Sequence, residues 1–296
     1  MLPKHYRPHS LSNGIDMNIG IVGLGLIGAS LAGDLRRQGH QLYGVSRQLI
    51  TCEKALQRGL VDFASQDLAL LKATEVVFLC TPINLILPTL EKLVPHLKPD
   101  AIVTDVASVK TAIAKPATQL WPGFIGGHPM AGTADQGIDA AQENLFAGAP
   151  YVLTPTDNTD PTQLAQLQTL IEPLGIKLFC CSPAEHDQAV AWISHLPAMV
   201  SAALIQACDQ ETQGNIFLLA QQLASSGFRD TSRVGGGNPE LGRMMAEYNQ
   251  AALLKSLKIY QQQLSNLIKL IELEEWDEIE AKLQQSQGDR PKYLKT

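Results

Sequence analysis

The sequence has no excess of basic residues. Among its 296 residues, 23 are lysine or arginine and 29 are aspartate or glutamate, which gives a formal net charge of -6 without a block of like charges. Proteins whose main partner is nucleic acid or an anionic membrane usually present a basic patch. The composition therefore argues against both kinds of partner.

Long apolar runs and a secretory signal are also absent. The longest apolar run, residues 19–33, contains five glycines and is too short to span a bilayer. Residues 1–16 lack the apolar stretch of a signal peptide, and Met17 directly precedes the first expected strand. We expect residues 1–16 to be a disordered tail or an upstream start that takes no part in the fold.

Cysteine is scarce and shows no metal-ligand spacing. The five cysteines form an odd set, and the adjacent Cys180 and Cys181 would point to opposite faces of a strand. We expect reduced, mostly buried thiols in a cytoplasmic protein, and no metal site.

Short strand-like runs alternate with helical stretches in the first part of the chain. The expected strands are residues 18–22, 41–46, 75–80, 101–105, 151–154 and 176–181. The expected helices are residues 26–38, 49–58, 82–97, a segment from 108 onward, and 161–174. This alternation predicts parallel pairing in a doubly wound α/β sheet, over residues 17–182.

The strand signal disappears after Pro183, which predicts an all-α domain over residues 183–296. Residues 184–208 are apolar almost all round, as expected for a helix buried inside such a domain. A heptad seam follows at Leu253, Leu257, Tyr260, Leu264, Leu267 and Ile271. It suits an internal helix contact or a subunit interface, and we favour a homodimer built by the helical domain.

A glycine pattern follows the first expected strand and opens a helix: Gly23-Leu24-Gly25-Leu26-Ile27-Gly28. In this context the pattern predicts a dinucleotide site. Gly23 permits the tight turn, Gly25 lets the pyrophosphate approach the backbone, and Gly28 lets the helix lie close to the strand. The helix N-terminus supplies N–H groups for the phosphates, and Leu26 and Ile27 belong to the same site.

The second expected strand ends without the acidic residue that usually holds the ribose of NAD. Ser46 and Arg47 stand there instead. A serine and an arginine can hold a 2′-phosphate that a carboxylate would repel, so we predict NADP as the cofactor. Arg47 could instead be a surface charge. Thr81 and Pro82 follow another strand end and either shape the nicotinamide pocket or form a plain turn.

One histidine stands out from the others. Residues 126–132 read Gly-Gly-His-Pro-Met-Ala-Gly. Pro129 favours an extended backbone at His128, and the glycines suit an open loop that another molecule can approach. We predict that His128 performs the chemistry.

Residues 105–110 leave the next strand at the same edge of the sheet. Ser108 could cap the following helix or face a substrate. Lys110 could be a surface charge or a functional group.

Two segments of the helical domain contain further candidates. Ser194 and His195 lie in Ser-His-Leu-Pro, which interrupts an apolar helix, and are either satisfied core residues or substrate ligands. Arg229 and Arg233 are four residues apart, hence on one helical face, and Asp230 could pair with one of them. We favour Arg233 for holding a substrate carboxylate.

These motifs together resemble the prephenate/arogenate dehydrogenase family, and most closely the NADP-dependent arogenate dehydrogenases of cyanobacteria. The matching segments, in the family's order, are residues 23–28, 105–110, 126–132, 194–197 and 228–233. The resemblance implies a Rossmann-type domain followed by an all-α dimerisation domain. It also implies oxidative decarboxylation of L-arogenate to L-tyrosine.

The resemblance assigns roles to residues as well. His128 would accept the C4 hydroxyl proton, Ser108 would hydrogen-bond the same hydroxyl, and Arg233 would hold a carboxylate. Ser194, His195 and Thr133 would also bind substrate. Two positions depart from the commoner bacterial pattern, Ala134 in place of glutamate and Ala198 in place of histidine, and both bear on the choice between arogenate and prephenate.

Other interpretations stay open. The enzyme could be a prephenate dehydrogenase that forms 4-hydroxyphenylpyruvate. A β-hydroxyacid dehydrogenase shares the two-domain plan but uses a lysine after a Gly-Gly segment, and no lysine follows Gly235–Gly237 closely. An NADP-sensing regulator without catalytic activity is the alternative of another class.

Overall fold

The structure is a computed structural model that describes residues 16–133, 135–211 and 214–294. The chain forms two compact units, residues 1–249 and 250–296. The predicted tail lies outside the described residues except for Asp16, and so does Ala134. The predicted domain boundary at residue 182 marks the change from strands to helices and stays a prediction.

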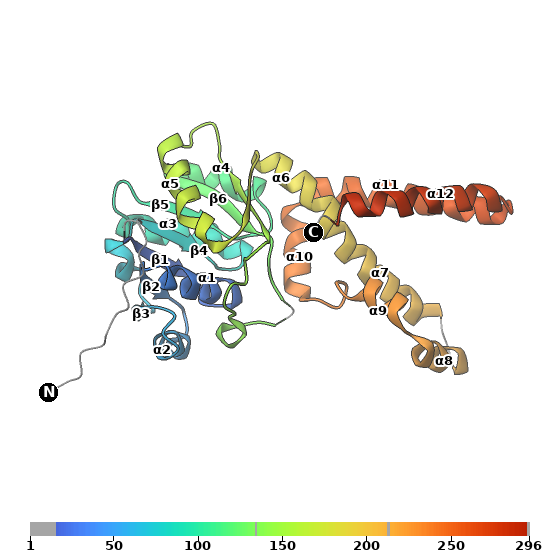
Figure 1. The fold of residues 1–296 in the computed structure, drawn as a ribbon, viewed down its shortest axis with the longest axis horizontal. Coiled ribbons are helices and arrows are strands. Elements are labelled where there is room, and N and C mark those ends of the chain that lie inside the picture. Colours follow the sequence, from blue (N-terminus) through green and yellow to red (C-terminus); the bar gives the residue numbers. More distant parts are fainter. Residues whose placement is uncertain (1–15, 134, 212–213, 295–296) are drawn as a thin grey trace. The chain divides into compact units, whose positions relative to one another are not determined.

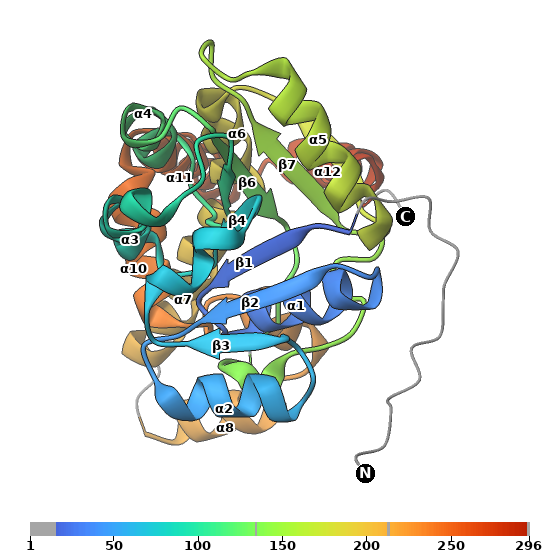
Figure 2. The ribbon, with the colours of Figure 1, turned by 90° about the vertical axis from the view of Figure 1, so that its left-hand side faces the viewer.

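The first unit contains one eight-stranded sheet in the order β3-β2-β1-β4-β5-β6-β7-β8 (Figure 2). Its strands are β1 (Asn18–Val22), β2 (Gln41–Val45), β3 (Phe63–Ser65), β4 (Val76–Leu79), β5 (Ile102–Asp105), β6 (Phe124–Pro129), β7 (Pro150–Thr154) and β8 (Lys177–Cys180). All neighbours pair in parallel except β6 and β7, which are antiparallel. The predicted doubly wound α/β sheet is confirmed, with one exception in strand direction.

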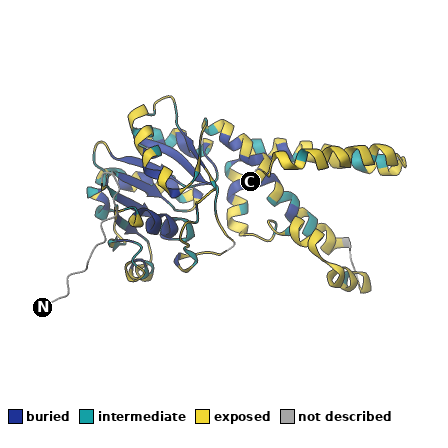
Figure 3. Ribbon diagram, viewed as in Figure 1, coloured by how far each residue is buried: buried dark blue, intermediate teal, exposed yellow. Residues whose placement is uncertain are grey.

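Helices cover both faces of this sheet (Figures 1 and 2). They are α1 (Leu26–Arg37), α2 (Leu49–Gln57), α3 (Ile86–Leu93), α4 (Thr111–Leu120) and α5 (Pro161–Ile171). Alternate strand residues enter two different cores, since successive side chains of a strand point to opposite faces. Ile19, Ile21 and Phe78 belong to the core with α1 and α5, and Val77 and Val103 to the core with α3 and α4. The strands β4, β5 and β6 in the middle of the sheet are buried along their whole length (Figure 3).

The sheet is followed by helices, as predicted. The first unit continues with α6 (Pro183–Val190), a π-helical turn (Ala191–His195), α7 (Leu196–Glu211), α8 (Asn215–Leu223), α9 (Ser226–Ser232) and α10 (Pro239–Tyr248). The second unit contains α11 (Gln250–Glu272) and α12 (Trp276–Asp289). The heptad seam lies on α11, where Tyr260, Leu264 and Ile271 are exposed in the single chain.

Two strands were missed, and one expectation about a helix is wrong. The strands β3 and β6 were not predicted, because β3 has only three residues and β6 contains two glycines and a proline. The long apolar helix is not buried in the single chain. The stretch Pro183–Gln210 is long and apolar enough to cross a membrane by length and composition, and only 28% of its most apolar window is buried.

A twenty-residue connection joins β6 to β7 and includes the short helix η4 (Ile138–Ala140). The middle of its backbone is fixed to α1 and to the end of α2. Arg58 donates to the carbonyl oxygens of Ile138 and Ala141, and Ser30 accepts from the backbone N–H of Gln142. A connection without a crossover helix lets β7 run antiparallel to β6.

Candidate functional site

The glycine turn after β1 has the geometry that a dinucleotide requires. Gly23 has φ of +97°, and a Cβ on it would lie 2.5 Å from the carbonyl oxygen of Cys80. A Cβ on Gly28 would lie 2.0 Å from the carbonyl oxygen of Gly23. Side chains are therefore excluded at both positions, and α1 packs directly against the turn.

The first turn of α1 is open to an anion. Apart from Gly25 and its two neighbours in the sequence, no described residue has a heavy atom within 4 Å of the position that a Cβ of Gly25 would take. Gly25 is the N-cap of α1 without a side-chain cap, and the first turn contains no acidic residue. Unsatisfied N–H groups and the positive end of the helix dipole favour a phosphate at such a place, so the turn fits a dinucleotide.

A cleft of about 520 Å³ extends from this turn along the carboxyl ends of the strands. Ser46 and Arg47 line it at the end of β2, and Thr81 and Pro82 line it after β4. The hydroxyl of Thr81 is buried and has no hydrogen-bond partner among the described residues. Ser46, Arg47, Thr81 and Pro82 therefore share one cleft with Gly23 and Gly25. Of the other predicted cofactor residues, Leu26 and Ile27 line a second cleft, and Gly28 lines neither.

His128 does not lie on an open loop, and this expectation is wrong. It belongs to β6, which is buried along its whole length. The two glycines before it serve packing, because a Cβ on Gly126 would lie 2.3 Å from Oγ1 of Thr154. A Cβ on Gly127 would lie 2.7 Å from the carbonyl oxygen of Asp105. Glycine at both positions lets β6 lie close to β5 and β7.

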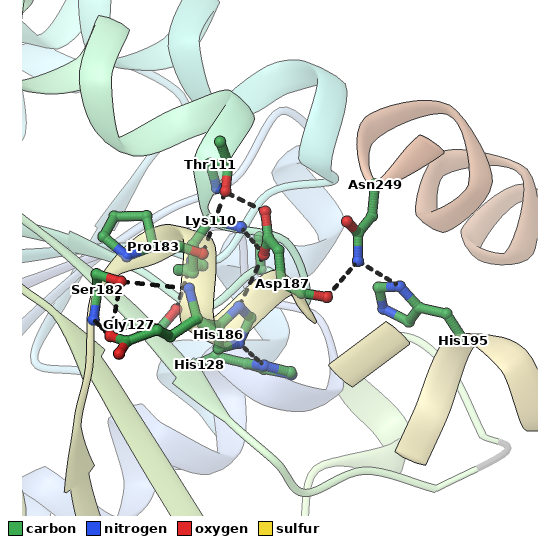
Figure 4. A network of polar contacts seen from close by, with 12 residues as sticks. Lys110, Thr111, Gly127, His128, Ser182, Pro183, His186, Asp187, His195 and Asn249 are labelled. Carbon is green, nitrogen blue, oxygen red and sulfur yellow. Dashed lines mark hydrogen bonds and ion pairs between the residues drawn. The ribbon is translucent and has the colours of Figure 1, made fainter. Parts of the chain in front are cut away.

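His128 ends a chain of three buried side chains that begins on α6 (Figure 4). Nδ1 of His186 lies 2.8 Å from Oδ1 of Asp187. Nε2 of His186 lies 2.8 Å from Nδ1 of His128. The arrangement is a carboxylate and two imidazoles connected in series, with His128 at the end nearest the cleft.

The hydrogen-bonded series Asp187–His186–His128 determines which nitrogen of His128 is basic. Burial raises the pKa of Asp187, but hydrogen bonds from His186 and from two backbone N–H groups outweigh burial and hold this pKa below its ordinary value. A neutral His186 that donates to this carboxylate through Nδ1 accepts at Nε2. Nδ1 of His128 is then a donor, and Nε2 of His128 keeps its lone pair.

The electrostatic surroundings keep His128 neutral. Burial lowers its pKa well below the ordinary value, and a positive charge on His186, Lys110 or His195 would lower it further. Within the described part of the chain, Nε2 of His128 has no hydrogen-bond partner. A neutral imidazole with one lone pair that accepts no hydrogen bond is suited to accept a proton as a general base.

Asp187 also caps α4, which excludes the capping role considered for Ser108. Its carboxylate accepts from the backbone N–H of Lys110 at 2.8 Å and of Thr111 at 2.7 Å (Figure 4). The N-terminus of α4 therefore does not use Ser108 as its cap. The Ser108 hydroxyl is buried without a hydrogen-bond partner in the described chain, as expected for a group that awaits a ligand.

Lys110 is not a surface charge. Its side chain is fully buried and forms an ion pair with Asp105. Nζ also donates to the carbonyl oxygen of Gly127 at 2.6 Å, and Asp105 accepts from the backbone N–H of Gly127 at 3.1 Å. The pair fixes the strand position directly before His128.

His195 lies in the π-helical turn between α6 and α7. Pro197 has no N–H to donate to the preceding turn, which accounts for the interrupted helix. The amide nitrogen of Asn249 lies 3.1 Å from Nδ1 of His195 and 2.8 Å from the carbonyl oxygen of Asp187. Since an amide nitrogen only donates, Nε2 of His195 is the protonated nitrogen. Burial lowers the pKa of His195 to about 4.

A second cleft, of about 460 Å³, brings the cofactor turn and the candidate chemistry together. Its lining includes Leu26, Ile27, Thr81, Pro82, Ser108 and His128 from the sheet part and the start of α10 from the helical part. Ser194, His195, Thr133 and Arg233 are not among the lining residues. His195 is buried beside Asn249, whereas Thr133 and Arg233 are exposed, and the substrate roles of these residues stay predictions. Arg229, and not Arg233, pairs with Asp230, at 3.0 Å.

The sequence analysis missed His186, Asp187 and Asn249. His186 lies 58 residues after His128, and no spacing rule connects them. One signal was available for part of this group. Ser182 and Glu185 form a capping box that fixes the start of α6, and this places His186 and Asp187 on its first turns.

The comparisons with known proteins agree with this geometry. Residues 31–180 match the model of the prephenate dehydrogenase nucleotide-binding domain, and residues 182–285 match the model of the prephenate dehydrogenase dimerization domain. The chain belongs to the prephenate dehydrogenase family. It is therefore a dehydrogenase with a nucleotide-binding domain and a following helical domain, as the resemblance implied.

Solved structures from this family are similar over nearly the whole chain. The arogenate dehydrogenase of Synechocystis is 72% identical with a TM-score of 0.85, and the match covers 94% of this chain and 100% of that one. The prephenate dehydrogenase of Aquifex aeolicus, in complex with hydroxyphenyl propionate and NAD+, is 28% identical with a TM-score of 0.89, covering 95% and 100% of the two chains. The cyclohexadienyl dehydrogenase of Zymomonas mobilis is 30% identical over 92% of this chain and 94% of its own length.

Proposed function

We propose that the protein is an NADP-dependent arogenate dehydrogenase, which converts L-arogenate into L-tyrosine and carbon dioxide. The observation that carries this proposal is the second cleft, where the basic nitrogen of His128 and the unsatisfied hydroxyl of Ser108 meet the cofactor turn. The similarity to the Synechocystis arogenate dehydrogenase supports the choice of substrate.

The chemistry follows from the protonation states of the site. Nε2 of His128 accepts the proton of the C4 hydroxyl, and Ser108 hydrogen-bonds the same oxygen. Bound NADP supplies the acceptor for the hydride that leaves C4. The ring carboxylate leaves as carbon dioxide, its bonding electrons complete the aromatic ring, and the C4 oxygen becomes the phenol oxygen of tyrosine. The chain from His128 through His186 to Asp187 stabilises the imidazolium that forms.

The substrate is held by residues of both parts of the first unit. Arg233 binds a carboxylate, and Ser194, His195 and Thr133 bind the remaining polar groups. Because Nδ1 of His195 accepts from Asn249, its Nε2–H is the group that donates to the substrate.

NADP is favoured over NAD by the charges around the first cleft. No acidic side chain is present among the described residues that line it, whereas Arg47 and Lys92 are. A 2′-phosphate is attracted to such a site, and Ser46 adds a hydroxyl donor.

A four-way assay tests substrate and cofactor together. We expect the highest kcat/KM for L-arogenate with NADP, a lower value for prephenate, and a clear loss for either substrate with NAD. Initial rates are measured from the appearance of the reduced cofactor. Equal efficiency with NAD would contradict the cofactor assignment, and the absence of turnover with both substrates would favour a regulator over an enzyme.

A homodimer completes the proposal. The apolar surface of the Pro183–Gln210 helix is mostly uncovered in the single chain, and the matched family model for residues 182–285 describes a dimerization domain. A second copy that covers this helix would remove the exposed apolar surface from water.

Activity is expected to persist into mildly acidic solution. His128 accepts a proton only when it is neutral, so kcat/KM falls as the pH drops through its pKa. Burial holds this pKa well below 6.5, which places the acid limb below pH 6.5. The measurement is kcat/KM for L-arogenate at saturating NADP from pH 5 to 9. An acid limb with its midpoint at or above pH 6.5 would mean that a group other than His128 accepts the C4 hydroxyl proton.

A further inference from the structure

The second cleft is lined by one charged side chain among the described residues, that of Glu240. The other lining residues are apolar or uncharged, and His128 is neutral because its pKa is lowered by burial. A single carboxylate in such a wall sets the sign of the charge that a ligand meets there. Its position therefore bears on which substrate the cleft accepts.

Glu240 is fixed by the first turn of α10. The Asn238 side chain accepts from the backbone N–H of Glu240 at 2.8 Å and of Leu241 at 3.1 Å. Pro239 occupies the first position of the helix, where its fixed φ favours helix formation. Glu240 and Met244 are four residues apart, so they share a helix face, and both line the cleft.

The dipole of α10 alone does not explain why the Glu240 side chain lines the cleft. An acidic residue in a first turn is stabilised by the helix dipole, but any orientation of its side chain would serve that purpose. Glu240 forms no ion pair within the described part of the chain, whereas Glu247 on the same helix pairs with Arg243. The acid that faces the cleft is thus the one that lacks a cationic partner.

The two candidate substrates differ at a single group. L-arogenate carries an ammonium group on its side chain, and prephenate carries a keto group at the same place. We propose that Glu240 binds the side-chain ammonium of L-arogenate and disfavours prephenate, which has an uncharged keto group there and therefore no positive charge to offset its carboxylates. This inference rests on the proposed dehydrogenase function and adds the residue that selects its substrate.

The test compares Glu240→Gln with the wild-type enzyme on both substrates at saturating NADP. A hydrogen bond to a charged group contributes enough that its loss lowers kcat/KM for L-arogenate by about 10- to 100-fold. The loss is expected mainly in KM. The kcat/KM for prephenate is expected to stay the same or rise, since the negative charge of Glu240, which repels the carboxylates of prephenate, has been removed.

Glu247→Gln is the matched control, because it makes the same change on the same helix outside the cleft. It is expected to leave both kcat/KM values unchanged. Thermal unfolding of both variants checks that α10 remains folded.

Several outcomes would overturn the inference. Equal losses for both substrates, with a raised KM for NADP, would place the carboxylate against the cofactor. Unchanged kinetics in Glu240→Gln would mean that the Glu240 carboxylate remains solvated and does not contact the substrate. A wild-type enzyme that prefers prephenate would contradict the inference while leaving the dehydrogenase function intact. Wild-type inactivity with both substrates would instead contradict the proposed function itself.

Discussion

His128→Asn is expected to lower kcat for L-arogenate by about 10³-fold, the middle of the range for loss of a general base. Asparagine can still donate to Nε2 of His186 and fills a similar space on β6, so the strand should keep its position. It has no basic nitrogen, and the C4 hydroxyl proton would have to leave to water. The measurement is the steady-state rate with NADP and L-arogenate, for wild type and variant.

The control for His128→Asn separates chemistry from binding. The dissociation constant for NADP should change little, because the 520 Å³ cleft is not lined by His128. His96→Asn, at a histidine that lines neither cleft, should behave as wild type. Near-normal turnover in His128→Asn would remove this residue from the catalytic role.

Local patterns predicted the parts of the site that depend on neighbours in the sequence. The turn from Gly23 to Gly28 was predicted because its strand, its glycines and its helix are contiguous. Ser108 was predicted because it follows a strand end, and strand ends of a doubly wound sheet meet at one edge. His128 was predicted from the glycines and the proline beside it, although the loop expected there is a strand. These rules require no knowledge of the helical part.

The parts that depend on distant contacts could not be predicted. His186 contributes to the site only through its hydrogen bond to His128, which lies 58 residues earlier. Asn249 lies 54 residues after His195. The strand β6 was interpreted as a loop because Gly126, Gly127 and Pro129 are rare inside strands. Only the tertiary structure shows that both glycines are needed there for close packing.

Lys110 shows how a polar residue can be misassigned from local sequence alone. Lysine is almost never fully buried unless it is paired, so exposure was a reasonable expectation for a lysine just before a helix. The carboxylate that pairs with it is only five residues earlier, on the last position of β5. Because the chain turns back between β5 and α4, the two side chains meet in the interior.

Lys110→Met is expected to reduce the free energy of unfolding by about 3–5 kcal/mol, the cost of breaking a buried ion pair. Methionine fills much of the space of the lysine side chain but leaves the carboxylate of Asp105 without its counter-charge. It also leaves the carbonyl oxygen of Gly127 without the donor that Lys110 provides. The measurement is urea unfolding at pH 7, followed by circular dichroism. Turnover should fall as well, because Gly127 directly precedes His128.

Lys115→Met is the matched control, since Lys115 lies on α4 and is exposed. Its effect on stability should stay within about 0.5 kcal/mol, as for most surface substitutions. The double variant Lys110→Met with Asp105→Asn should be less destabilised than the sum of the two single variants, because it leaves no uncompensated charge. A Lys110→Met protein as stable as Lys115→Met would show that the ion pair is not needed to hold β6. Additive effects in the double variant would show that the two groups act independently, and the position of His128 would then depend on the glycine packing of β6 alone.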